Sequence, residues 1–227
     1  MLNRSALYLP ANRDSAIAKA RTLPADCIIL DLEDAVQPDA KDAARAAAVA
    51  AATAGGWGDR TLLLRVNALA TPWSAADFAA VPGVTALLAG MADLAKDLRA
   101  RPDAARTPLL YSLSAIVVAA RASAKLAIDG VFTDITDPAG FVVEAEQGLM
   151  LGFDGKSLIH PSQVDPCNAV FSPTPAEIDT AQGLIAAYEA GLVAGKGVTT
   201  FNGKLVEVLH VETARRTLAL ADQVATR

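Results

Sequence analysis

Apolar and polar positions follow two different periods along the first two thirds of the chain, and these periods predict strands and helices in turn. Short apolar runs rich in Leu and β-branched residues are typical of strands buried on both faces of a parallel sheet. Longer segments with apolar residues three or four positions apart are typical of amphipathic helices. The expected strands are 5–10, 27–32, 61–67, 84–89, 128–133 and 155–160. The expected helices begin near residue 14 and then cover 39–54, 73–80, 92–101, 112–124 and 138–151.

This alternation predicts an α/β fold with a parallel sheet, because neighbouring parallel strands need a helical crossover. After residue 161 the pattern changes. Thr174-Pro-Ala-Glu177 predicts the capped start of a long helix. Asn202-Gly203 predicts the tight turn of a β-hairpin, and a last helix is expected at 211–225. We therefore predict a barrel-like domain at 1–165 and a helix–hairpin–helix extension at 166–227, which packs on the barrel or on a neighbouring subunit.

Three carboxylates follow the second expected strand. Cys27-Ile-Ile-Leu-Asp-Leu-Glu-Asp34 is an apolar run that ends in Asp31, Glu33 and Asp34. In open α/β sheets and (β/α) barrels the active site lies at the carboxyl ends of the strands. Acids clustered there are costly unless cations, donors or a metal compensate their charge. The pattern therefore indicates a functional site, although a helix cap followed by a solvated turn would leave the same pattern.

Composition narrows the class of protein. The chain has 227 residues, of which 52% are apolar, enough for a domain with a large core. Its formal net charge is −5 and it has no basic block, which argues against a nucleic-acid partner. No apolar run is long and uncharged enough to suggest a membrane span. Two cysteines and two histidines without a cluster disfavour zinc and fit a reducing compartment, so we expect a cytoplasmic protein.

Seven short sequence motifs occur in a characteristic order along the chain. Each motif alone is weak evidence for a family. They are Leu7-Tyr-Leu-Pro-Ala-Asn-Arg13, Asp31-Leu-Glu-Asp-Ala-Val36, Leu64-Arg-Val-Asn67, Gly90-Met-Ala-Asp-Leu94, Ala127-Ile-Asp-Gly-Val-Phe-Thr-Asp134, Gly152-Phe-Asp-Gly-Lys156 and Ile159-His-Pro-Ser-Gln163. Together they resemble the citrate lyase β-subunit branch of the HpcH/HpaI aldolase superfamily. The resemblance extends over nearly the whole chain.

The resemblance implies a TIM-type (β/α) barrel, usually trimeric, that uses Mg²⁺ to cleave or form a C–C bond in acyl-CoA thioesters such as citryl-CoA or malyl-CoA. It implies that Arg65 binds the substrate carboxylate and that Asp93 is a metal ligand. It places Asp31, Glu33 and Asp34 beneath the metal and its waters. The family also has a catalytic acid in a C-terminal segment that reaches a neighbouring subunit, and Glu207 occupies that place.

The chain departs from the family between its third and fourth expected strands. Family members have two further βα units there, one of which carries a Glu that is the second acidic metal ligand. In this chain, residues 73–84 lead directly to the later strand, so we expect six strands instead of eight. Because barrel diameter depends on strand number, the barrel is expected to be tight, open or completed by a partner.

We therefore predict an oligomeric Mg²⁺-dependent C–C lyase that converts a β-hydroxyacyl-CoA into acetyl-CoA and a keto acid, with citrate lyase subunits as candidate partners. Two alternatives stay open. One is a catalytically silent paralogue that binds a ligand or partner, and the other is a metal-dependent aldolase that does not use CoA.

Each of the predicted site residues could also have a purely structural role. Arg65 can pair with neighbouring acids, Asp93 suits the first turn of a helix, and Glu207 can be a solvated charge.

Overall fold

The computed structural model of the chain describes residues 2–32, 35–65, 79, 85–195 and 198–226. These residues form two compact units, Asn3–Phe171 and Ser172–Arg227. The helix expected at 73–80 lies outside the described residues, apart from Ala79.

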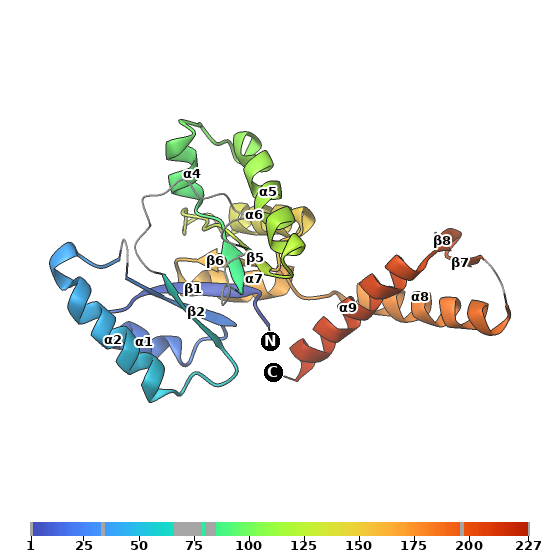
Figure 1. Cartoon of the computed structure of the whole chain (residues 1–227), viewed down its shortest axis with the longest axis horizontal. Helices are drawn as coiled ribbons and strands as arrows, with labels where there is room; N and C mark the ends of the chain where they lie inside the picture. The colour runs from blue at the N-terminus through green and yellow to red at the C-terminus, as the bar shows by residue number, and fades with distance from the viewer. Residues whose placement is uncertain (1, 33–34, 66–78, 80–84, 196–197, 227) are drawn as a thin grey trace. The chain divides into compact units, whose positions relative to one another are not determined.

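The first unit is built on six parallel strands that form a curled half-barrel (Figure 1). The strands are β1 (Ser5–Pro10), β2 (Cys27–Asp31), β3 (Thr61–Arg65), β4 (Ala86–Leu88), β5 (Leu126–Asp129) and β6 (Gly155–Leu158). Their order across the sheet is β3-β2-β1-β6-β5-β4, so the first strand lies near the centre. In the described part of the chain, the edge strands β3 and β4 do not pair with each other. The prediction of an incomplete barrel-like α/β fold is therefore confirmed.

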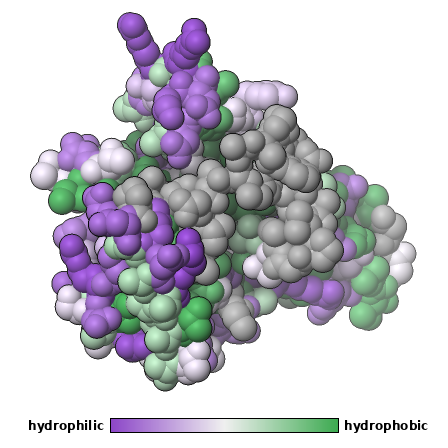
Figure 2. Space-filling model, turned by 60° about the vertical axis from the view of Figure 1, so that its left-hand side comes forward, coloured by the Kyte–Doolittle hydropathy of each residue, from purple (hydrophilic) through white to green (hydrophobic). Residues whose placement is uncertain are grey.

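Helices connect these strands and cover the outer face of the sheet. They are α1 (Asp14–Ala20), α2 (Lys41–Ala54), α4 (Met91–Asp97), α5 (Leu110–Ala122), α6 (Pro138–Leu151) and α7 (Val164–Val170), with single 3₁₀ turns at Pro38–Ala40, Thr107–Leu109 and Pro161–Gln163. The helix α2 buries Ala44, Ala48 and Ala51, which share one face. The view in Figure 2 brings forward the side on which α1 and α2 lie in Figure 1, and it carries many hydrophilic side chains. The helix α2 is thus amphipathic, as its sequence period predicts.

The sheet separates two apolar clusters because successive side chains of a strand point to opposite faces. The larger cluster lies between sheet and helices and includes Leu7, Ile28 and Phe141. The smaller cluster lies on the inner face of the half-barrel. Its members are Ala6, Cys27, Ile29 and Ile128, packed against by Tyr8, Leu63, Ala86 and Leu88.

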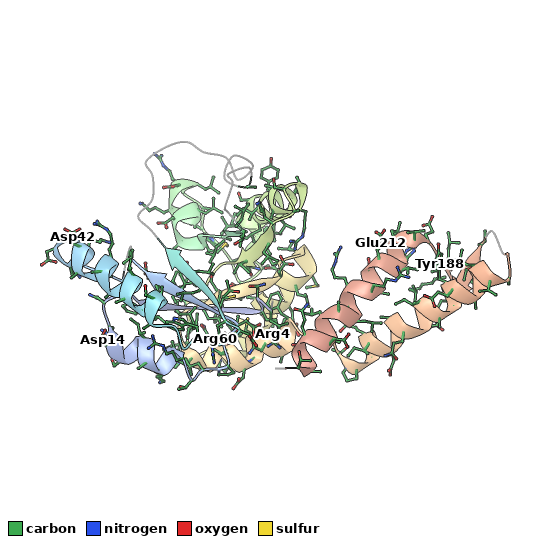
Figure 3. The ribbon with its side chains drawn as sticks, turned by 60° about the horizontal axis from the view of Figure 1, so that its bottom comes forward. Arg4, Asp14, Asp42, Arg60, Tyr188 and Glu212 are labelled. Atoms are coloured by element: carbon green, nitrogen blue, oxygen red, sulfur yellow. The ribbon has the colours of Figure 1, made fainter. Side chains whose placement is uncertain are left out.

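Two arginines stabilise the amino-terminal end of the sheet (Figure 3). Arg4 donates from Nε and Nη2 to the two carboxylate oxygens of Asp26, at 2.7 and 3.0 Å, and both residues are buried. Arg60 donates from Nη2 to the Leu23 carbonyl oxygen at 2.6 Å. A bidentate pair of this kind fixes geometry as well as charge, so the starts of β1 and β2 are held together.

The ends of α6 follow local rules. Asp137 caps α6 by accepting a hydrogen bond from the Gly140 amide at 2.8 Å, and Gly152 ends the helix with φ +96°. The helix expected at 92–101 is shorter than predicted, because α4 ends at Asp97. Arg99 then adopts φ +52°, a left-handed conformation that an α-helix cannot continue through.

The second unit is a helical hairpin with a small two-stranded sheet at its turn. It contains α8 (Pro175–Val193), β7 (Thr199–Phe201), β8 (Lys204–Val206) and α9 (Val208–Ala225). Thr174 and Glu177 form the predicted capping box, in which the Thr174 amide donates to Glu177 Oε2 at 2.8 Å. Asn202 and Gly203 have φ of +48° and +75°, as the two central residues of a type I′ turn require.

Candidate active site

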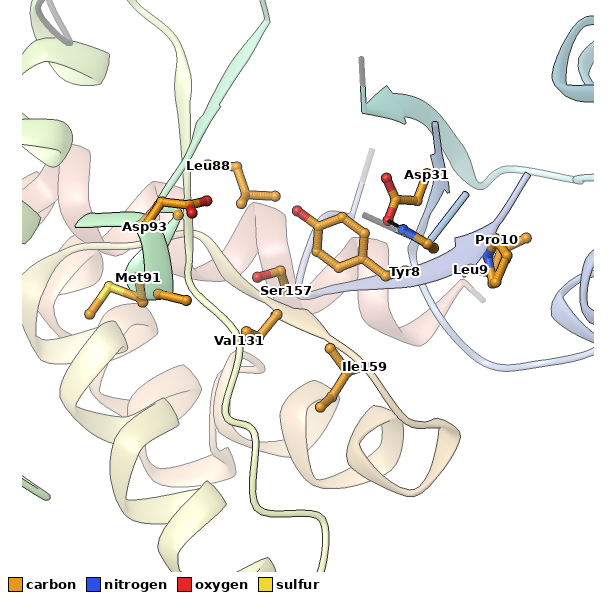
Figure 4. Close-up of a pocket in the computed structure, with 14 residues that line it drawn as sticks. Tyr8, Leu9, Pro10, Asp31, Leu88, Met91, Asp93, Val131, Ser157 and Ile159 are labelled. Carbon is orange, nitrogen blue, oxygen red and sulfur yellow. Dashed lines mark hydrogen bonds between the residues drawn. The ribbon is translucent and has the colours of Figure 1, made fainter. Parts of the chain in front are cut away.

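A pocket of about 490 Å³ opens at the carboxyl ends of the strands of the first unit (Figure 4). Residues from β1, β2, β4 and β6, and from the start of α4, line it. The residues that matter for its chemistry are Tyr8, Asp31, Leu88, Asp93 and Ser157. This is the end of a parallel sheet at which ligands bind in α/β folds, and the sequence predicts the site there.

Asp31 ends β2 on the inner face of the half-barrel. Only 3% of its surface is exposed, and its Oδ2 accepts a hydrogen bond from the Ala35 amide at 3.2 Å. The loop that follows is held by Lys41, whose Nζ donates to the Leu32 carbonyl oxygen at 2.7 Å. A carboxylate this buried requires nearby donors or cations, and Asp31 lies at the wall of the pocket. Glu33 and Asp34 lie outside the described residues.

Arg65 is placed by the register of the sheet. The backbone of β3 pairs Arg65 with Asp31, and β2 pairs Asp31 with Pro10. Residues paired in this way share one face of a parallel sheet, so Arg65 belongs to the same row as the pocket residues Asp31 and Pro10. The structure does not describe its side chain.

Asp93 lies in the first turn of α4, on the opposite side of the pocket from Asp31 (Figure 4). Its side chain is exposed, in contrast to that of Asp31. The pocket therefore brings together two predicted acids that are 62 residues apart in the sequence.

The oxygen atoms of this pocket fit a hard divalent cation. Mg²⁺ prefers oxygen ligands, keeps several waters and is often held by only one or two protein carboxylates. Asp93 and Asp31 supply carboxylate oxygens, and no thiol or imidazole lines the described pocket. Within the described ranges, no group of three or more Asp, Glu, His and Cys side chains is arranged to hold a metal. Among the described residues, Asp93 and Asp31 are thus the ones that could hold such a cation, with water or substrate as further ligands.

Two hydroxyl groups of the pocket are absent from the predicted site residues. Tyr8 projects from the centre of β1, and its hydroxyl points toward the side of the pocket formed by Leu88 and Asp93 (Figure 4). Ser157 on β6 is fully buried and donates from Oγ to the Asp129 carbonyl oxygen at 2.9 Å. The alternation of faces along 5–10 could have indicated Tyr8, because it places residue 8 on the same face as residues 6 and 10.

A buried ionic network on the outer face of β5 and β6 supports the pocket from behind. The Asp129 carboxylate accepts hydrogen bonds from Arg106 Nη1 at 2.8 Å and Lys156 Nζ at 3.0 Å. Lys156 also donates to Glu144 Oε1 at 2.7 Å. A Cβ on Gly148 would lie 2.7 Å from Asp129 Oδ2, so glycine is required there. The charged residues within otherwise apolar strands are the sequence signal of this network.

Glu207 lies in the second unit, where it precedes α9. Its backbone amide donates to His210 Nδ1 at 3.0 Å, and its side chain is exposed. It is therefore the N-cap residue of a helix. That it reaches the active site of another subunit stays a prediction.

The model of the HpcH/HpaI aldolase/citrate lyase family matches residues 4–81 and 73–161. The chain belongs to this family. The resemblance expected from the seven sequence segments is thereby confirmed. The two matches overlap at 73–81, within the stretch where the resemblance leads one to expect two further βα units.

Relatives of this HpcH/HpaI family member include enzymes with two different names. The (3S)-malyl-CoA thioesterase of Cereibacter sphaeroides (strain KD131) is 38% identical over 274 aligned residues, which cover 98% of this chain and 95% of that protein. The citrate lyase subunit beta of Escherichia coli K12 is 30% identical, with 96% of this chain and 93% of that protein covered. Since the first alignment spans 274 positions and this chain has 227 residues, the relative holds residues without a counterpart here.

Among solved structures, the HpcH/HpaI family member resembles CitE of Mycobacterium tuberculosis in complex with magnesium, acetoacetate and coenzyme A. The TM-score is 0.69 at 25% identity, and the match covers 96% of this chain and 97% of that one.

None of the helices in the described part of the chain is both long and apolar enough to cross a membrane.

Proposed function

We propose that the protein is a Mg²⁺-dependent C–C lyase that acts on a β-hydroxyacyl-CoA of the citryl-CoA or malyl-CoA type and releases acetyl-CoA and a keto acid. The observation that carries this proposal is the pairing of a buried acid, Asp31, with an exposed acid, Asp93, across one pocket at the strand ends. The family relationship supports it, since relatives are named for citrate lyase and malyl-CoA chemistry, and a structural neighbour holds magnesium and coenzyme A.

The residues of the pocket have distinct roles in this proposal. Asp93 would hold the cation, and the acids Asp31, Glu33 and Asp34 at the end of the second strand would support it, directly or through water. The cation, when bound, polarises the oxygen that becomes the keto group. Arg65 binds the free carboxylate of the acyl unit, because a guanidinium offers two parallel donors that match a carboxylate. These contacts orient the bond to be broken.

Glu207 supplies the proton-transferring group in this proposal, from a neighbouring copy in a homotrimer. The surface around the hairpin of the second unit supports docking on another copy of the chain. Large apolar side chains there are more than half exposed, and exposed apolar clusters mark interaction surfaces. They are Leu192, Val193, Val198, Leu205, Val208 and Leu209.

Thioester hydrolysis is a second candidate. The malyl-CoA thioesterase of C. sphaeroides is 38% identical to this chain, whereas the citrate lyase subunit beta of E. coli is 30% identical. Hydrolysis would give free CoA and a dicarboxylic or tricarboxylic acid, whereas the lyase reaction would give acetyl-CoA and a keto acid. The two reactions are therefore separable by their products.

The test measures acetyl-CoA, free CoA and keto acid after incubation of the full chain with malyl-CoA or citryl-CoA, with Mg²⁺ or with EDTA. We expect Mg²⁺-dependent acetyl-CoA release. Asp93→Asn is expected to lower kcat/KM at least about 10²-fold, because loss of a metal ligand removes charge stabilisation of several kcal/mol. The matched control is Asp97→Asn, which changes an exposed acid at the other end of the same helix and is expected to keep full activity.

Other products in this assay would favour one of the alternative functions. Free CoA without acetyl-CoA would favour the thioesterase. No turnover of any thioester by the wild-type chain would favour the silent paralogue. Condensation of pyruvate with an aldehyde, unaffected by CoA, would favour the CoA-independent aldolase.

A further inference from the structure

Tyr8 occupies a central position in the half-barrel. It lies on β1, which has β2 on one side and β6 on the other. The register pairs Tyr8 with Ile29 of β2, so its side chain shares the inner face with the buried cluster of Ala6, Cys27, Ile29 and Ile128. The ring packs against this cluster and is half-buried. Its position is therefore fixed by the sheet and by apolar contacts, not by a loop.

The hydroxyl end of Tyr8 belongs to the pocket. Figure 4 shows the ring between Asp31 on one side and Leu88 and Asp93 on the other, with the hydroxyl directed toward the latter. A phenylalanine could fill the same space on the inner-face cluster, so packing alone does not account for the hydroxyl. A phenol O–H also rotates about its C–O bond and can take a new acceptor when a ligand enters.

Tyr8 also differs in kind from the other polar side chains of the described pocket. Ionised Asp31 and Asp93 can only accept hydrogen bonds. Ser157 commits its hydroxyl proton to the Asp129 carbonyl oxygen, at 2.9 Å. Unlike the two ionised acids, the Tyr8 hydroxyl can donate a hydrogen bond to an oxygen of a bound substrate.

We propose that the Tyr8 hydroxyl donates a hydrogen bond to the thioester carbonyl oxygen of the bound acyl-CoA. This inference rests on the proposed function, but it does not depend on which of the two reactions occurs. In C–C cleavage the electron pair of the breaking bond moves onto the thioester unit, and its oxygen becomes an enolate oxygen. In hydrolysis, attack by water at the carbonyl carbon makes the same oxygen a tetrahedral oxyanion. In both, Tyr8 keeps its proton and stabilises charge that is larger in the transition state than in the substrate.

The first test is Tyr8→Phe, which keeps the ring and removes the hydroxyl. The matched control is Tyr111→Phe on α5, where 85% of the tyrosine surface is exposed. We expect kcat of Tyr8→Phe to fall about 10²–10³-fold, the usual cost of one oxyanion donor, with KM changed less than about threefold. Tyr111→Phe should match wild type. A Tyr8→Phe kcat within twofold of wild type would overturn the inference.

The second test needs no turnover. Calorimetry compares acetyl-CoA, which has the carbonyl oxygen, with S-ethyl-CoA, which has none. Tyr8→Phe should weaken acetyl-CoA binding about 5- to 10-fold, the size of one hydrogen bond, and leave S-ethyl-CoA binding unchanged. Equal weakening of both ligands would mean that Tyr8 only shapes the pocket and would overturn the inference.

A third measurement covers the case in which Tyr8→Phe fails to fold. Replacement of Tyr8 by 3-fluorotyrosine keeps both ring and hydroxyl but makes the hydroxyl more acidic. We expect the alkaline limb of the kcat–pH profile to move to lower pH, and an unmoved limb would contradict the assignment. If the wild-type chain neither turns over thioesters nor binds acetyl-CoA, the proposed function fails. If the wild type turns over thioesters and binds acetyl-CoA, and the Tyr8 variants do so equally well, the Tyr8 inference fails while the proposed function stands.

Discussion

Asp129 shows how a single buried charge is accommodated in this fold. It has no exposed surface, yet its carboxylate accepts from Arg106, Lys156 and the Gly130 amide. Its carbonyl oxygen accepts from Ser157, whose side chain lines the pocket. One residue therefore links the ionic network on the outer face of the sheet to a residue that lines the pocket.

Removing the charge of Asp129 should be costly. In Asp129→Asn, the buried Arg106 and Lys156 keep Glu144 but lose the fully buried acid that both contact, and breaking a buried pair typically costs about 3–5 kcal/mol. We expect a loss of this size in the free energy of unfolding, measured by guanidinium denaturation. Glu146→Gln is the control, because Glu146 is an exposed acid on α6, the helix that carries Glu144. A loss below about 1 kcal/mol for Asp129→Asn would contradict this interpretation of the network.

The two cysteines are buried core residues. Burial raises the pKa of Cys27 to about 11 and that of Cys167 to about 12. Both thiols therefore stay protonated near neutral pH, and a protonated thiol is a poor nucleophile. Neither cysteine is a candidate for covalent chemistry in the folded chain.

At the scale of elements, the start of α8 depends on local chemistry alone. Thr174 and Glu177 satisfy each other's backbone and side-chain groups, and Pro175 is the first helical residue. Donation by the Thr174 amide, and next by its hydroxyl, lowers the pKa of Glu177 below its ordinary value. The box is therefore complete only while Glu177 is ionised.

The capping box gives a prediction with a pH dependence. Thr174→Ala should destabilise the start of α8 by about 1 kcal/mol, the typical cost of an N-cap, while Thr174→Ser should keep the cap. Because the folded-state pKa of Glu177 is lowered, its contribution is present above the ordinary Glu pKa and is lost as the pH falls through the lowered value. Hydrogen exchange of the first-turn amides of α8 measures both effects. Equal protection in the Ala and Ser variants would contradict the prediction.

At the scale of the whole molecule, the half-barrel gathers the site from distant segments. The register of β1, β2 and β3 brings Pro10, Asp31 and Arg65 into one row, and α4 brings Asp93 to the same pocket. These contributions come from four elements spread over the first 93 residues. Among the described residues, the pocket is therefore built on a sheet of six strands, whereas the resemblance leads one to expect eight.

The proposed role of Glu207 from a neighbouring copy predicts complementation between inactive variants. Arg65→Ala and Glu207→Gln should each be nearly inactive alone, with losses of at least about 10²-fold. Coexpression of the two variants should restore part of the activity, because some sites then combine an intact Arg65 with an intact Glu207 from another chain. Glu212→Gln, at an exposed acid of α9, is the control for Glu207→Gln. Full activity of Glu207→Gln, or a monomeric mass by light scattering for the active protein, would contradict this proposal.

Much of the fold was predictable because its determinants are local. The run Cys27–Leu32 reads as a buried strand, and the structure has β2 at Cys27–Asp31. The Asn202-Gly203 turn is also where the sequence places it. The residues at which helices end were less predictable. The apolar period continues past Asp97, but the left-handed conformation of Arg99 ends α4 early, and no pattern of apolar residues encodes that.

The sequence by itself determined the kinds of elements, their order, the capping box and hairpin turn of the second unit, and the acid at the end of β2, since each depends on residues close together in the chain. Only the tertiary structure decided which distant groups meet. It placed Tyr8 between Asp31 and Asp93, and it closed the network of Arg106, Asp129, Lys156 and Glu144. The reason is physical. Those contacts depend on the strand order β3-β2-β1-β6-β5-β4 and on its curvature, which arise from burial of the whole sheet and are not written in the period of any single segment.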